Sequence, residues 1–136
     1  AGTLSIDTCT PSHPVSLLHV HGTADENLPI DGGAGKGVAG VSFRPPIDGI
    51  RTLARVDGCP STPTTTTDPD NADVTIDTWS PCSQGTEVQL VKVAGASHAF
   101  MGGPQRPAQR AVVGEAYDRY SSAQEIWEFL AAHPRA

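Results

Sequence analysis

The sequence has no long hydrophobic run and few aromatic or basic residues. No apolar segment approaches the roughly 20 residues that a membrane-spanning helix requires. Lysine and arginine together number 9 against 15 acidic residues, which gives a formal net charge of -6. This balance, without a basic cluster, argues against nucleic acid or a membrane as a partner. Aromatic residues make up only 5% of the 136 residues, so we expect one domain with a mainly aliphatic core.

Cysteine is also scarce, with three residues at Cys9, Cys59 and Cys82. None forms a C-x-x-C pair, so the spacing does not support a zinc ribbon or a thioredoxin-like motif. Cys59 and Cys82 flank a loop rich in threonine, proline and aspartate, and a disulfide between them would stabilise the fold by roughly 3 kcal/mol. Cys9 would then be left over, which suggests a partner outside this chain. The alternative is three reduced, buried thiols.

The clearest strand pattern lies between Pro14 and Asp25, after thirteen irregular residues. Apolar residues from Val15 to Val20 lead directly into the segment HGTAD, which ends at Asp25. A short apolar run with a glycine stop predicts a strand buried on both faces of a parallel sheet. In open α/β sheets, ligands bind beyond the carboxyl ends of such strands. Asp25 is therefore either a catalytic carboxylate or only a cap for the next turn.

The middle of the chain predicts loops around one helix. Glu26–Gly40 contains several glycines but lacks the G-x-x-x-x-G-K-[ST] spacing of a phosphate loop, so we expect a flexible loop there. Pro45-Pro46 opens a predicted helix that ends at Gly58. Its predicted apolar face consists of Ile47, Ile50, Leu53 and Ala54. Cys59–Asp73 is predicted to be a loop.

The last part predicts a hairpin, a loop and a final helix. Val74–Trp79 and Glu87–Val93 alternate as two strands would, and the turn residues between them indicate a hairpin. Gly102–Gly114 is predicted to be a loop. Ser122 and Glu125 fit a capping box for a helix that ends at Pro134. The predicted core-facing stripe of this helix consists of Ala123, Ile126, Trp127 and Leu130. The chain is thus predicted to be α/β, with a mixed sheet, a hairpin and flanking helices.

Asp25 and His98 each follow the end of a predicted strand. A carboxylate that orients an imidazole lets the ring act as a general base. Each residue also has a structural alternative, since His98 could simply bond to backbone groups. Along the chain, a strand and Asp25 come first, a strand and His98 follow, and a helix comes last. This order favours a catalytic pair.

The segments HGTAD at 21–25, with Pro29 and Gly32-Gly33 after it, and GASHAF at 95–100 resemble a known family. They are similar to the C-terminal half of an α/β-hydrolase, and especially to secreted esterases of the polyhydroxybutyrate depolymerase and feruloyl esterase type. The resemblance extends to the two loop cysteines and to residues 126–130. It implies that Asp25 is the acid and His98 the base of a catalytic triad, and that the substrate is a carboxylic ester.

The family's nucleophile does not appear in this sequence. In that family the triad residues follow one another in the order Ser, Asp, His. No G-x-S-x-G segment precedes Asp25 in this sequence. Only Ser5, Ser12 and Ser16 stand before it, and none fits a strand-turn-helix elbow. Residues 1–136 are therefore expected to form a single partial domain that is inactive alone. Ala1 is expected to be a processed end or an artificial boundary. The expected partner is the missing N-terminal half or a second copy, and secretion is expected.

Two other functions remain open at this point. His19-x-His21 with Asp25 and His98 could supply the ligands of a metal-dependent hydrolase, although His19 and His21 could equally be two strand residues that share a face. A non-catalytic interaction module would use Trp79, Trp127 and Phe100 as a contact surface, although Trp127 also fits a core position. Under the leading hypothesis the chain needs neither a metal nor another cofactor.

Overall fold

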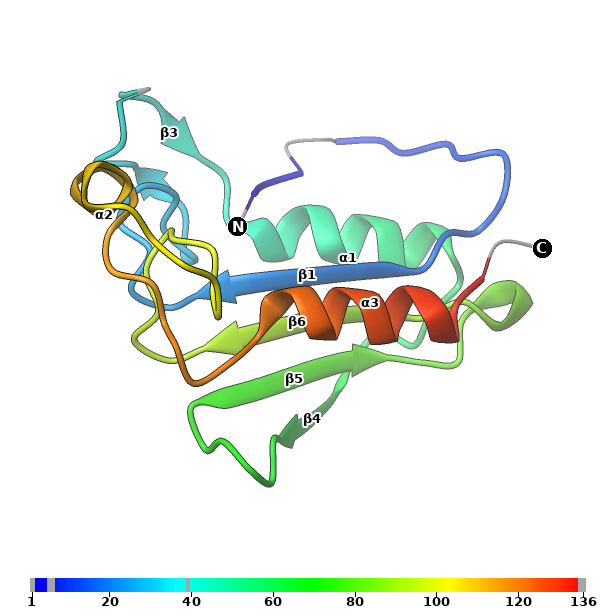
Figure 1. Ribbon diagram of the computed structural model, residues 1–136. Helices are drawn as coiled ribbons and strands as arrows, with labels where there is room; N and C mark the ends of the chain where they lie inside the picture. The colour runs from blue at the N-terminus through cyan, green and yellow to red at the C-terminus, as the bar shows by residue number, and fades with distance from the viewer. Residues whose placement is uncertain (1, 5–6, 39, 135–136) are drawn as a thin grey trace.

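A computed structural model describes residues 2–4, 7–38 and 40–134 (Figure 1). The described residues form a mixed four-stranded sheet, three α-helices, one short 3₁₀ helix and a small two-stranded ribbon. The elements are β1 (Leu17–Gly22), β2 (Gly33–Ala34), β3 (Ser42–Phe43), α1 (Pro46–Val56), β4 (Thr64–Thr67), β5 (Val74–Trp79), η1 (Ser83–Gly85), β6 (Val88–Val93), α2 (Pro107–Val113) and α3 (Ser122–Ala132). None of the described helices has the length and hydrophobicity needed to cross a membrane.

The sheet has the strand order β1-β6-β5-β4. β1 runs parallel to β6, with Leu17 opposite Val88 and Gly22 opposite Val93. β5 and β6 are antiparallel, which confirms the predicted hairpin. β4 adds antiparallel to β5 at the far edge, so the prediction that 59–73 is entirely loop was wrong. β2 likewise falls within the predicted loop 26–40.

β6, and not β1, is the strand buried on both faces. Its side chains alternate between two clusters, with Val88 and Leu90 on the α1 face and Val91 and Val93 on the opposite face. β1 lies at the edge of the sheet, and its first four residues are only half-buried. The prediction of a fully buried first strand was therefore wrong, although its parallel pairing was right.

α1 covers one face of the sheet, whereas α3 crosses the other face beside β1 (Figure 1). Pro46 stands in the first turn of α1, and Ile50, Leu53 and Ala54 are buried, as predicted. The helix ends at Val56, Asp57 is its C-cap, and Gly58 takes the left-handed conformation (φ 69°) that closes many helices.

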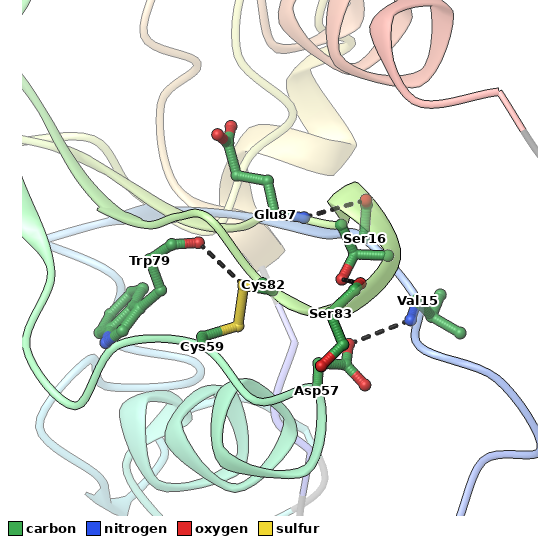
Figure 2. The surroundings of a disulfide bond; sticks show 9 residues. Val15, Ser16, Asp57, Cys59, Trp79, Cys82, Ser83 and Glu87 are labelled. Carbon is green, nitrogen blue, oxygen red and sulfur yellow. Dashed lines mark hydrogen bonds between the residues drawn. A yellow bond between two sulfur atoms is a disulfide. The ribbon is translucent and has the colours of Figure 1, made fainter.

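A disulfide joins Cys59 to Cys82, as proposed from their spacing (Figure 2). It ties the end of α1 to the β5–β6 connection. Asp57 strengthens this junction, because its carboxylate accepts a hydrogen bond from the Val15 amide (3.0 Å) and its carbonyl accepts one from the Ser83 amide (2.8 Å). Cys9 is a free, half-buried thiol.

Three predictions about the C-terminal region were wrong. The predicted loop 102–114 contains α2, a short helix with proline in its first turn and no buried residue. α3 is capped by Ser121 rather than Ser122, since the Ser121 hydroxyl accepts a hydrogen bond from the Gln124 amide (3.3 Å). The stripe predicted to face the core is instead exposed at all four positions, namely Ala123, Ile126, Trp127 and Leu130.

Candidate functional site

The loops that follow β1 and β6 are joined by backbone hydrogen bonds. The Thr23 amide donates to the Val93 carbonyl and the Ala24 amide donates to the Ala96 carbonyl, both at 3.0 Å. Gly22 lies where the loops are closest, and a Cβ atom there would stand 2.1 Å from the Ala96 carbonyl oxygen. A side chain at Gly22 would therefore push the two loops apart. This close approach brings Asp25 and His98, 73 residues apart, to one place.

Asp25 is buried, with an exposed fraction of 3%. Its Oδ1 atom accepts hydrogen bonds from the Asn27 amide (2.9 Å) and the Leu28 amide (2.8 Å). Its Oδ2 atom accepts a hydrogen bond from His98 Nδ1 at 2.8 Å. Both oxygens of the carboxylate are therefore fixed, one by backbone amides and the other by an imidazole.

His98 is placed to act as a base. Because the Asp25 carboxylate is an acceptor, His98 carries its proton on Nδ1, and its Nε2 atom is free to accept a proton. The His98 side chain is 30% exposed. It borders an open pocket of about 330 Å³, which we call the edge pocket. The lining residues include Leu18, His19, Val20, Phe100, Met101 and Ile126.

His19 and His21 lie on the same face of β1, as the structural interpretation of the H-x-H pair expected. His19 Nε2 is 2.9 Å from His21 Nδ1, and His21 Nε2 is 2.9 Å from the Leu28 carbonyl oxygen. Burial lowers the pKa of both rings, and it brings the pKa of His19 to about 4. Both rings are thus neutral near pH 7.

The described residues do not form the metal site considered from the sequence. Among them, no three histidine, cysteine or acidic side chains are arranged to hold one ion. Both nitrogens of His21 are already engaged, with His19 and with the Leu28 carbonyl. The two histidines therefore point at each other and at the protein, not at a common centre.

No hydrogen bond joins His98 to Ser12 or Ser16, the described serines that precede Asp25. Ser5 lies outside the described residues, and Ser12 is exposed in the irregular segment before β1. Ser16 accepts a hydrogen bond from the Glu87 amide (3.2 Å) beside the disulfide, where β1 begins (Figure 2). The six residues of β1, about 20 Å in length, separate it from the His98 end of the sheet.

The aromatic residues considered as a contact surface lie in different surroundings. Trp79 is buried, with an exposed fraction of 1%, so it cannot contact a partner. Phe100 and Trp127 are 61% and 71% exposed, which is unusual for such large apolar side chains. The interpretation of Trp127 as a core residue was therefore wrong for this chain.

Comparisons with protein-family models, with curated proteins and with solved structures found no match for this chain.

Proposed function

We propose that this chain supplies the acid and the base of a serine carboxylic-ester hydrolase, and that another polypeptide segment supplies the nucleophile. The proposal rests on the 2.8 Å hydrogen bond between the buried Asp25 carboxylate and His98, whose side chain borders an open pocket. This is the arrangement that a general base needs in order to take a proton from a hydroxyl nucleophile.

In the proposed reaction, His98 Nε2 removes the proton of the serine hydroxyl as the oxygen attacks the ester carbonyl. Asp25 stabilises the imidazolium that forms and keeps the ring in its orientation. The same proton then passes from His98 to the leaving alcohol, and water completes hydrolysis by the reverse sequence. No step requires Asp25 to become protonated.

The unpaired edge of β1 favours a partner segment that carries the serine. The amides of Leu17 and Thr23 donate to carbonyls of the β6 segment. Because successive residues alternate between the two edges of a strand, Leu18 and Val20 direct their backbone polar groups away from β6. In the described part of the chain no strand pairs with that edge. An added strand would satisfy these groups and end close to His98.

The apolar surface beside this edge also favours a covering segment. Ile126, Trp127 and Leu130 on α3 are 38%, 71% and 58% exposed, and Phe100 is 61% exposed. Side chains of this size and spacing are typical of a helix face that packs against other structure. We propose that the missing N-terminal half of an α/β-hydrolase domain covers them, and that a second copy is the alternative occupant.

The motifs HGTAD and GASHAF favour a substrate class related to polyhydroxybutyrate depolymerases and feruloyl esterases. Secretion is part of the proposal as well. The Cys59–Cys82 disulfide is compatible with an extracellular location, since such bonds persist in oxidising compartments.

Hydrolysis of a p-nitrophenyl ester tests the proposal. This chain alone should show no hydrolysis that depends on His98. In the complete product of the gene, kcat/KM should fall about 1,000,000-fold in His98→Ala and about 10,000-fold in Asp25→Asn. The variant His13→Ala, at an exposed histidine, is the matched control and should keep full activity. A complete gene product without esterase activity, or one that keeps it in His98→Ala, would refute the proposal.

A complete gene product without esterase activity would favour a non-catalytic interaction module. The exposed Phe100 and Trp127 side chains are the observation that supports this second candidate. It differs from the first in one respect, since it requires the apolar surface but not the Asp25–His98 hydrogen bond.

A further inference from the structure

His21 is a fully buried imidazole that the Asp25–His98 contact does not use. Its exposed fraction is 0%. Its Nε2 atom lies 2.9 Å from the Leu28 carbonyl oxygen and 3.6 Å from Asp25 Oδ2. Its Nδ1 atom lies 2.9 Å from His19 Nε2, and the two rings are stacked with their centroids 5.2 Å apart. A buried ring with both nitrogens engaged has one orientation available to it.

The partners of His21 determine where its proton lies. A carbonyl oxygen can only accept, so His21 Nε2 carries the hydrogen that it shares with Leu28. In a neutral ring the Nδ1 atom is then an acceptor, and His19 Nε2 must donate to it. Because burial lowers the pKa of both rings, both remain neutral at pH 7. The hydrogen bonds therefore run in one direction, from His19 through His21 to Leu28.

Leu28 connects this chain of hydrogen bonds to the carboxylate. Its carbonyl accepts from His21, and its amide donates to Asp25 Oδ1 at 2.8 Å. The position of His21 thus determines the position of a donor that fixes one oxygen of Asp25. The same Nε2–H group also lies near Oδ2, the oxygen that binds His98. Without His21, the buried Leu28 carbonyl would lose its partner and the carboxylate could rotate.

We infer that His21 is a positioning residue for the Asp25–His98 pair, and that His19 holds His21 in the required tautomer. The inference rests on the proposed function, because it assigns His21 a role only in aligning that pair. His21 contacts no reacting atom, since it is fully buried and its two nitrogens engage His19 and the Leu28 carbonyl.

Nitrogen-15 NMR of the histidine rings tests this directly in the 136-residue chain. In the unmodified protein we expect His98 protonated on Nδ1 and His21 protonated on Nε2. In His21→Phe, which keeps a ring but removes both nitrogens, the His98 Nδ1–H proton should exchange with water about tenfold faster. In His21→Gln the amide nitrogen can still donate to the Leu28 carbonyl, so slow exchange should be restored. A purely space-filling role would give the opposite ranking of the two variants.

An Asp25→Asn variant tests the Asp25–His98 pair separately from the positioning role of His21. It replaces one carboxylate oxygen by a donor, so the Nδ1–H tautomer of His98 should no longer be favoured over the Nε2–H tautomer. If this variant changes His98 and a folded His21→Phe does not, the inference is refuted and the catalytic pair stands. If neither variant changes His98, the pair itself is refuted. Should His21→Phe fail to fold, finding His21 protonated on Nδ1 in the unmodified protein would refute the inference by itself.

Discussion

Acid should destabilise this fold through His19, and the structure gives a magnitude for the effect. Burial, followed by the neighbouring His21, lowers the pKa of His19 from 6.5 to about 4. The unfolded chain therefore binds a proton at His19 between pH 6.5 and pH 4, whereas the folded chain does not. Stability falls as the pH falls through this window, because the unfolded state binds more protons there. Between pH 7 and pH 5 the loss from this one group is about 2 kcal/mol.

Urea denaturation at pH 7 and pH 5, followed by the fluorescence of the buried Trp79, measures this loss. From pH 7 to pH 5, the free energy of unfolding should fall about 2 kcal/mol less in His19→Gln than in the unmodified chain, since the glutamine side chain does not titrate. His13→Gln, at an exposed histidine, is the control and should behave as the unmodified chain does. Equal pH sensitivity in His19→Gln and the unmodified chain would refute the assignment of His19 as a partly buried, neutral ring.

Three further predictions concern stability and association. Cys59→Ser should lower the free energy of unfolding by roughly 3 kcal/mol in urea titrations, whereas Cys9→Ser should change it little. Gly22→Ala should cost more than about 2 kcal/mol by the same measurement, because its Cβ would clash with the Ala96 carbonyl; an unchanged midpoint would contradict the loop geometry. Trp127→Ser should leave stability within about 0.5 kcal/mol but weaken self-association or partner binding in sedimentation experiments, and a large loss of stability would show that Trp127 is a core residue.

The sequence was most informative where local chemistry determines structure. The glycine that ends β1, the hairpin pattern and the proline start of α1 are local signals, and the structure contains each of these elements. The loop that carries Asp25 and the loop that carries His98 were expected to meet, and they do so through a 2.8 Å hydrogen bond. Parallel pairing of β1 with β6 makes this meeting possible, since both strand ends reach the same edge of the sheet.

The errors arose where burial depends on tertiary structure. Helical periodicity correctly grouped Ile126, Trp127 and Leu130, but it cannot say whether this chain supplies the surface that covers them. β4 was missed because all four of its threonines are exposed, so it has no hydrophobic alternation, although threonine itself favours strands. α2 was missed for a similar reason, since it buries no side chain. The role of His21 could not be inferred before the Leu28 carbonyl was located beside it.

Labelling with a fluorophosphonate, which reacts with an activated serine, tests whether Asp25 and His98 activate a serine that lies outside this chain. In the complete gene product we expect one labelled serine that mass spectrometry places outside these 136 residues, and we expect labelling to be lost in His98→Ala and strongly reduced in Asp25→Asn. His13→Ala should be labelled normally. Labelling of a serine within the 136 residues, or labelling that persists in His98→Ala, would contradict the claim that this chain supplies the acid and base to a nucleophile carried elsewhere.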